Sequence, residues 1–381
     1  MFVAATLQAL VRSEPDANLA VPADAWPALL ERAADTDSLG LLALVCESAG
    51  APAAVREELD RHLIREARHQ ALCWVEAERL CAALTANGIA SVVLKGAALA
   101  RSIYPRPGVR TFRDLDLLVR PDQRDAAHRL LLTLGYQDAV PAALLEVYRR
   151  DHFHFILEGV GRPRVELHWS LVRPDEPYRL NADDLLLDAR EIVGINRFPC
   201  PHPDGHVLHV AASLLRSGFT EFKRLIDLDR LIRSGAEIRW DRVAGLANER
   251  GLALALRLSL DLCGEMLGTD VAPAAASLAP LGVIRKRLDT IGVRSFPLHE
   301  PPADWRPVRH AVRYWLLHRR LHVVTQFIAN PRFERARLAV LGTPLWRRLL
   351  VAGKRVVIAA WLAAWQLGWT SAPAHRGRTQ L

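Results

Sequence analysis

Two aspartates in a short apolar run are the residues of this sequence best suited to chemistry. Asp114 and Asp116 lie in the run DLDLLV, which reads as a β-strand ending at Val119. Successive side chains of a strand point to opposite faces, so both carboxylates project together while Leu115 and Leu117 point into a core. Like charges repel unless a cation lies between them, and Mg²⁺ favours carboxylate ligands. The pattern indicates metal-assisted phosphoryl or nucleotidyl transfer; an edge strand with exposed acids is the alternative.

The same strand belongs to a longer stretch that resembles a known family. The run LKGAALARSIYPRPGVRTFRDLDLLV resembles the uncharacterised bacterial nucleotidyltransferase-like family of the DNA polymerase beta-like nucleotidyltransferase superfamily, and the resemblance is traceable over residues 60–235. It implies an α+β fold, in which a small mixed nucleotidyltransferase sheet is flanked by helices, with an N-terminal helical layer and a C-terminal helical region. In one departure, Ala97 replaces the serine that many superfamily members carry after the glycine. The phosphate must then be bound by backbone N–H groups, by Lys95 or by an arginine.

The resemblance also implies a third acid in an acid-Leu-His-Trp segment, and Glu166 occupies that place. Glu166 is expected to be the general base for an acceptor hydroxyl or a ligand of the nearest metal; a surface glutamate on a hairpin is the alternative. With Asp114 and Asp116 it would form the carboxylate set for two Mg²⁺ or Mn²⁺ ions. His168 shares its face and either supports the metal shell, binds a phosphate or makes an ordinary hydrogen bond beside Trp169.

Basic side chains before the strand and in a later helical segment are expected to bind the NTP. The full set of expected nucleotide-binding residues is Lys95, Gly96, Arg110, Arg113, His168, Lys223, Arg224 and Asp227. Lys95 and the two arginines near it would neutralise the triphosphate. Lys223 and Arg224 would contact phosphate or base, with Asp227 orienting one of them, although an ordinary amphipathic helix explains that segment equally well.

Composition limits the classes of partner and compartment. The 381-residue chain has a formal net charge of +8 and a pI near 9.6, which favours a polyanionic partner or substrate. Five scattered cysteines without a C-x-x-C pair indicate reduced thiols in a cytoplasmic protein. His202, His206 and His209 have the spacing of a helical zinc site, but without a cysteine partner structural histidines are favoured. Walker A, Rossmann and kinase signatures are absent.

The hydrophobic pattern and the distribution of Gly and Pro predict six segments. They are an N-terminal helical layer (residues 1–90), the nucleotidyltransferase catalytic core (91–200), a helical wall of the cleft (201–269), a connector (270–304), a C-terminal helical region (305–370) and a disordered tail (371–381). The apolar run 356–369 is shorter than the roughly 20 residues of a bilayer span. It is predicted either to make peripheral membrane contact or to form a buried or dimerisation helix.

The leading hypothesis is a metal-dependent nucleotidyltransferase that moves NMP from an NTP to a hydroxyl acceptor and releases pyrophosphate. A peptide, a protein or a small molecule is the expected acceptor. A nucleic acid is less favoured, because no RNA-binding module is recognisable. The alternative is a nucleotidyltransferase-fold binding or scaffold protein without turnover, in a peptide-modification or export system. Ala97 favours that alternative, and the intact trio of acids disfavours it.

Overall fold

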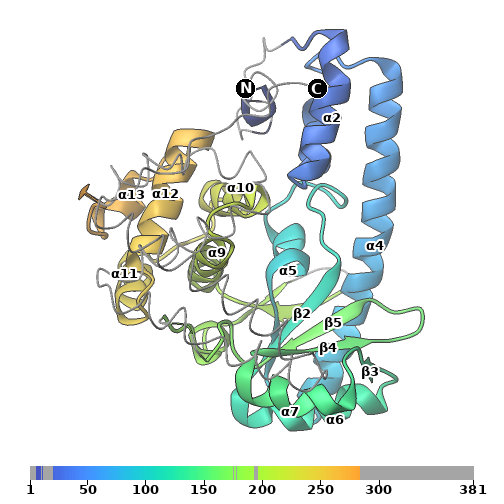
Figure 1. The fold of residues 1–381 in the computed structure, drawn as a ribbon, viewed down its shortest axis with the longest axis vertical. Helices are drawn as coiled ribbons and strands as arrows, with labels where there is room; N and C mark the ends of the chain where they lie inside the picture. The colour runs from blue at the N-terminus through green and yellow to red at the C-terminus, as the bar shows by residue number, and fades with distance from the viewer. Residues whose placement is uncertain are drawn as a thin grey trace, which may run out of the picture.

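The computed structural model describes residues 6–9, 11, 20–174, 176, 178–192 and 196–283. Within them, helices flank a five-stranded mixed sheet, so the expected α+β fold is confirmed (Figure 1). The predicted C-terminal helical region, the tail, the run 356–369 and most of the connector lie outside the described residues. In the part of the chain that is described, no helix combines the length and the apolar character needed to cross a bilayer.

The N-terminal layer is helical, as predicted. Its elements are η1 (Ala23–Ala25), α2 (Trp26–Asp35), α3 (Leu39–Val45) and α4 (Ala53–Ala86). In α4, apolar residues recur at helical spacing, and the positions on one side, including Leu80 and Leu84, are fully buried. The helix ends at Ala86 with Asn87 as its cap, and Gly88 then takes a positive φ of 69° that favours glycine.

The central sheet has the strand order β1-β2-β5-β4-β3. The strands are β1 (Ser91–Val93), β2 (Asp114–Val119), β3 (Gln137–Asp138), β4 (His154–Glu158) and β5 (Arg164–His168). β2 pairs in parallel with β5, and all other neighbours are antiparallel. The parallel pair requires a crossover, and η2 (Pro121–Gln123), α6 (Arg124–Thr133) and α7 (Ala142–Asp151) lie within that connection. The two-residue strand β3 and helix α7 were not predicted from the sequence.

Alternation along the strands gives the sheet one apolar face and a second face on which charged residues lie next to apolar ones such as Leu118. Leu115, Leu117 and Leu167 are fully buried in a cluster with residues of α4, α6 and α7. The residues that alternate with these leucines include the predicted acids, and they face the side on which α5 (Lys95–Ser102) and α9 (Pro203–Ser217) lie (Figure 1). The apolar face therefore anchors the sheet and leaves the opposite face free to carry charged groups.

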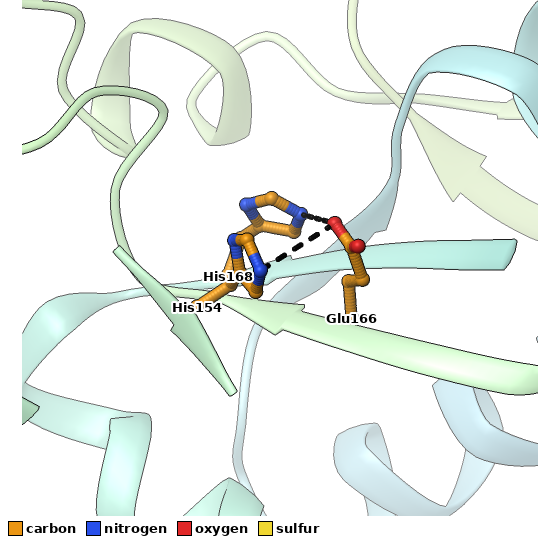
Figure 2. Close-up of side chains that lie close together, drawn as sticks. All are labelled: His154, Glu166 and His168. Atoms are coloured by element: carbon orange, nitrogen blue, oxygen red, sulfur yellow. Dashed lines mark ion pairs between the residues drawn. The ribbon is translucent and has the colours of Figure 1, made fainter. Parts of the chain in front are cut away.

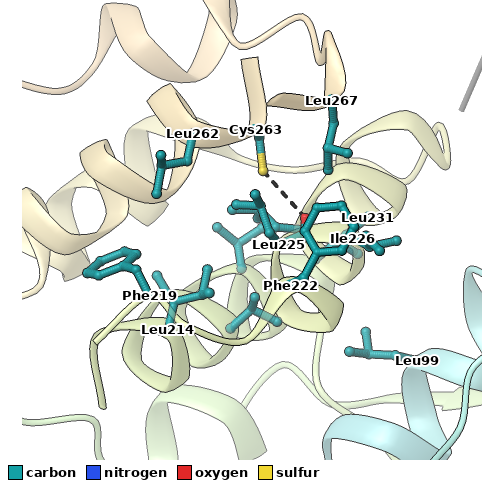
Figure 3. Packing of buried hydrophobic residues seen from close by; sticks show 14 of the residues in the cluster. Leu99, Leu214, Phe219, Phe222, Leu225, Ile226, Leu231, Leu262, Cys263 and Leu267 are labelled. Atoms are coloured by element: carbon teal, nitrogen blue, oxygen red, sulfur yellow. Dashed lines mark hydrogen bonds between the residues drawn. The ribbon is translucent and has the colours of Figure 1, made fainter. Parts of the chain in front are cut away.

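The segment after the sheet is mostly helical. It contains α8 (Asp183–Leu186), β6 (Arg190–Ile192), β7 (Phe198–Cys200), α9, α10 (Phe222–Arg233), α11 (Trp240–Glu249), α12 (Ala253–Leu267) and α13 (Ala272–Ala276). Figure 3 shows Leu214 of α9, Leu225 of α10 and Leu262 of α12 packed in one cluster that Leu99 of α5 also joins. This packing joins the helical wall to α5. The short helix α13 lies inside the segment predicted to be a connector.

The three histidines at and within α9 and all five cysteines are buried in the protein. His202 precedes α9, where its Nδ1 accepts a hydrogen bond from the backbone N–H of Asp204, and His206 and His209 are buried further along the helix. Burial lowers the pKa of His206 to about 4, so its imidazole is neutral at pH 7. All five cysteines are buried free thiols, in agreement with the absence of a disulfide framework.

Candidate functional site

The parallel pairing of β2 with β5 brings the three predicted acids onto one patch of the sheet. Asp116 lies directly opposite Glu166, and Asp114 lies two residues before Asp116 on the same face. His168 follows two residues after Glu166, and its Nε2 is 2.8 Å from Oδ1 of Asp116 and 3.3 Å from Oε2 of Glu166. The predicted grouping of these side chains is therefore present in the fold.

Asp116 is the buried centre of the patch. Its side chain is only 4% exposed, and its Oδ1 accepts hydrogen bonds from Nζ of Lys95 at 2.5 Å and from Nε2 of His168 at 2.8 Å. Burial alone would raise the pKa of Asp116, but the Lys95 ammonium and the His168 hydrogen bond hold that pKa well below its ordinary value. Asp116 is therefore ionised at neutral pH.

Asp114 has the opposite electrostatic character. Burial, together with the nearby charges of Asp116 and Glu166, raises the pKa of Asp114 to about 6, while Lys95 acts weakly in the other direction. Two carboxylates of one strand thus differ in their tendency to ionise because the Lys95 cation is bonded to only one of them. A cation between them would relieve the repulsion at Asp114.

The turn from β1 into α5 positions Lys95 by an unusual backbone conformation. Lys95 has a φ of 44°, in the left-handed region that non-glycine residues seldom occupy. Such conformations cost free energy, and they persist where surrounding contacts hold them and often where function requires them. Here the conformation directs the ammonium of Lys95 to the carboxylate of Asp116.

Gly96 is required at the next position by close packing. A Cβ atom there would lie 2.4 Å from Cβ of Phe112 and 2.9 Å from Nη1 of Arg110. We expect Gly96→Ala to lower the free energy of unfolding by about 1–3 kcal/mol, because the phenylalanine must move. Gly245→Ala is the matched control, since Gly245 lies in α11 with nothing within 4 Å of its would-be Cβ, and alanine there should stabilise the helix.

Urea denaturation of the two glycine variants measures this difference. Equal stability of Gly96→Ala and Gly245→Ala would contradict the tight packing of the turn.

Arg110 and Asp227 form a buried ion pair behind the turn. Nε of Arg110 donates to Oδ1 of Asp227 at 2.9 Å and Nη2 donates to Oδ2 at 2.6 Å, while the hydroxyl of Tyr104 also donates to Oδ1 at 2.7 Å. The prediction that Asp227 orients Lys223 or Arg224 is corrected here: its carboxylate is held by Arg110, which approaches it from the loop before β2. Tyr104 was not predicted as a partner, because 123 residues separate it from Asp227.

A cleft opens beside these residues, with a volume of about 220 Å³. The predicted residues that line it are Lys95, Gly96, Arg110, Arg113, Asp114, Asp116, Lys223 and Arg224. Glu166, His168 and Asp227 are not among its lining residues. The cleft therefore lies between the strand that carries the two aspartates, the α5 turn and the first turn of α10.

Most cations of the cleft already have carboxylate partners. Nη1 of Arg113 binds Glu66 of α4 at 2.9 Å, yet the arginine side chain is 69% exposed. Lys223 binds Asp37 at 2.6 Å, and Arg224 pairs with Glu221 one turn earlier. The Lys223–Asp37 pair lies at the surface and is weak, so an incoming polyanion can compete for the lysine. The Glu66 carboxylate is only 2% exposed and needs its arginine, but the exposed Arg113 guanidinium has further N–H groups that a phosphate can meet. Glu66 and Asp37 were not predicted, because both lie in the N-terminal layer.

A second histidine completes a compact group on the far side of Glu166. His154 of β4 lies directly opposite His168 of β5, and Figure 2 shows both rings converging on the Glu166 carboxylate. Nε2 of His154 is 3.8 Å from Oε2 of Glu166, and burial holds the pKa of His154 well below its ordinary value. His154 was not predicted from the sequence; only the register of the β4–β5 hairpin identifies it.

The donor types and charges of the patch fit a divalent cation. Asp114, Asp116 and Glu166 supply the oxygen ligands that hard ions prefer, and the raised pKa of Asp114 marks a carboxylate whose charge is incompletely balanced. Lys95 balances part of the charge through Asp116 alone. These three acids are thus suited to hold Mg²⁺ or Mn²⁺.

Comparisons with known proteins place most of the chain in a family. Residues 22–268 match a protein family described as "Uncharacterised nucleotidyltransferase", which extends the likeness beyond the residues that the sequence motifs cover. No match was found among curated proteins. The solved structures that match include an antigenic nucleotidyltransferase-like protein from Paracoccidioides brasiliensis, at 14% identity and a TM-score of 0.37, over 56% of this chain and 97% of that chain.

Proposed function

The chain belongs to the uncharacterised nucleotidyltransferase family, and we propose that it transfers NMP from an NTP to a hydroxyl acceptor with release of pyrophosphate. The observation that carries this proposal is the cleft that joins the two β2 aspartates to the cations of the α5 turn and α10. A triphosphate needs both features, because its own charge must be neutralised while the reacting phosphorus is positioned.

Each side chain has a role that follows from its position. Lys95 and Arg113 are placed to neutralise phosphate oxygens, and the start of α5 presents backbone N–H groups in place of the missing serine hydroxyl. Lys223 and Arg224 line the opposite wall, where they suit the remaining phosphates or the base. Arg110 borders the cleft but serves first as the buried partner of Asp227.

The carboxylates act on the reacting oxygens. Asp114, Asp116 and Glu166 would hold two Mg²⁺ or Mn²⁺ ions, which when bound supply charge neutralisation at the phosphates. Glu166 is the acid that we assign to the acceptor hydroxyl, either to receive its proton or to keep it in line. His168 fixes Asp116 through its hydrogen bond rather than contacting a phosphate. We propose a peptide, a protein or a small molecule as the acceptor.

Pyrophosphate release tests the proposal. The full chain is incubated with each of the four NTPs and Mg²⁺ or Mn²⁺, with cell extract as the source of acceptor. We expect metal-dependent release with at least one NTP. No release with any NTP, from a folded protein that binds nucleotide, would contradict turnover.

A second candidate function is nucleotide binding without turnover. The 2.5 Å contact between Lys95 and Asp116 favours it, since the ammonium already supplies a positive charge to that carboxylate. Both candidates predict NTP binding at the cleft. Only a measurement of turnover separates the two candidates. If the Lys95 ammonium takes the place of a metal ion at Asp116, Lys95→Met should bind Mg²⁺ or Mn²⁺ more tightly than wild type.

A further inference from the structure

Three side chains on neighbouring strands form a mixed nitrogen and oxygen group beside the carboxylate patch. His154 and His168 are directly opposite each other in the antiparallel β4–β5 ladder, and Glu166 lies two residues from His168 on the same face. Directly opposed and diagonal positions of such a ladder are close enough for side chains to meet. The register of the hairpin therefore brings two imidazoles and one carboxylate to a single point.

The ring of His154 lacks the hydrogen bonds that burial normally requires. Its side chain is only 10% exposed, and its Nδ1 is buried without a hydrogen-bond partner among the described residues. Its Nε2 points to Oε2 of Glu166 but stays 3.8 Å away, beyond hydrogen-bond distance. Nε2 therefore has no hydrogen-bond partner in the part of the chain that the structure describes, and it is the ring nitrogen that faces Glu166 and is available to an ion.

The spacing of the three atoms matches the coordination of a transition metal. Metal–nitrogen and metal–oxygen bonds of about 2.0–2.2 Å in a tetrahedron place neighbouring ligands roughly 3.4 Å apart. Oε2 of Glu166 is 3.3 Å from Nε2 of His168 and 3.8 Å from Nε2 of His154. The three ligand atoms all lie within 4.8 Å of one another. Small side-chain adjustments would bring them to bonding geometry.

The chemistry of the donors selects the class of ion. Mg²⁺ is bound through oxygen, whereas two imidazoles with one carboxylate suit zinc, manganese or iron. Two histidines and one glutamate are also a ligand set that binds Zn²⁺ with one position open. Glu166 is the partly exposed member of the trio, so the open position can face the solvent side.

We propose that His154, His168 and Glu166 bind one divalent transition-metal ion, beside an Mg²⁺ position held by Asp114 and Asp116. Nε2 of His168 then bonds to the ion in place of its hydrogen bond to Asp116, and Glu166 holds the transition metal in place of the second Mg²⁺. The site goes beyond the proposed function, because such an ion would bind even if the chain transferred no nucleotide. When bound, the ion gives Nε2 of His154 its missing partner and holds Glu166 as a ligand.

Zinc binding in excess Mg²⁺ tests the proposal. Full-length protein is stripped with a chelator, dialysed against Zn²⁺ with millimolar Mg²⁺, and its metal content is measured by mass spectrometry. We expect one Zn²⁺ that is lost, or bound at least about 10-fold more weakly, in His154→Gln and His168→Gln. Zn²⁺ should also raise the Tm of the wild type and not that of His154→Gln.

Two control variants locate the bound zinc at this trio. His128 is also buried and binds a carboxylate, Asp138, but its ring packs on Phe155 at the opposite face of β4, so His128→Gln should keep the zinc. Asp114→Asn should keep the zinc while losing Mg²⁺-dependent transfer, so the two proposals can fail independently.

His168→Gln breaks a buried hydrogen bond, and His154→Gln is therefore the decisive variant. Zinc content unchanged in a folded His154→Gln protein, or no zinc in the wild type, overturns the proposal.

Discussion

Asp114→Asn is expected to abolish nucleotidyl transfer while making the metal-free protein more stable. Asparagine keeps the size of the side chain but removes the charge that a metal ion needs, so transfer should fall by at least about 10²-fold. Burial and the charges of Asp116 and Glu166 raise the pKa of Asp114 to about 6, which shows that its ionised form is disfavoured in the fold. Removing that charge should add on the order of 1–3 kcal/mol to the free energy of unfolding at pH 7.

The pH dependence of stability gives an independent check on Asp114. Its pKa is about 6 in the folded protein and near the ordinary value of about 3.9 in the unfolded chain. Between these values the folded state binds more protons, so this residue makes the free energy of unfolding decrease as the pH rises from about 4 to 6. Buried histidines with lowered pKa values, such as His206, act in the opposite direction in both proteins, so the difference between the two isolates Asp114. Urea denaturation should show that the stability advantage of Asp114→Asn over wild type grows as the pH rises across that range. A variant less stable than wild type at pH 7 would contradict the charge repulsion.

Asp227→Ala is expected to cause the largest loss of stability. The substitution leaves the buried guanidinium of Arg110 without its bidentate partner and the hydroxyl of Tyr104 without its acceptor. Removing one member of a buried ion pair costs about 3–5 kcal/mol, because the remaining charge stays desolvated. Because Arg110 lies between the α5 turn and α10, this pair also joins the two walls of the cleft.

A surface pair of the same cleft provides the control for Asp227. Asp37 is 51% exposed and pairs with Lys223, so Asp37→Asn should cost at most about 1 kcal/mol. Asparagine also tolerates the positive φ of 53° at that position. Chemical denaturation at pH 7 compares the two variants. Equal losses would show that the Arg110–Asp227 pair contributes no more than a solvated contact.

Asp116 is a poorer test of chemistry than Asp114. Asp116 is bonded to Lys95 and His168 in a buried setting, so Asp116→Ala leaves an ammonium without its partner and is expected to destabilise the fold. A loss of activity in that variant would therefore mix two causes.

Local sequence patterns predicted the strand that carries the two aspartates and the helical layer before it. The bounds of β2 agree with the sequence analysis, and the long helix α4 lies in the predicted N-terminal helical layer, because regular apolar spacing and strand alternation give strong local signals. Glu166 and His168 on β5 were identified through the family resemblance, which implies an acid-Leu-His-Trp segment. Short elements such as β3, β6 and β7 were missed, since two or three residues carry too little periodicity to be recognised.

Long-range pairing could not be read from the sequence. The partner of Asp227 lies 117 residues away at Arg110, and the group around Glu166 gains His154 only when β4 pairs with β5 in one register. A shift of that register by one residue would turn His154 to the opposite face. The pKa values of the two aspartates could not be predicted from the sequence either. Asp114 and Asp116 look equivalent there, and only the position of Lys95 in the fold makes their pKa values differ.

The most direct test of nucleotidyl transfer follows a label from the NTP into the reaction products. Wild-type protein is incubated with Mg²⁺, an acceptor source and the reactive NTP, labelled in one sample at the α-phosphate and in another at the γ-phosphate. Nucleotidyl transfer predicts α-label on the acceptor and γ-label in pyrophosphate, with both signals lost in Asp114→Asn. The γ-label on the acceptor, or α-label transfer that persists in Asp114→Asn, would contradict nucleotidyl transfer at this site.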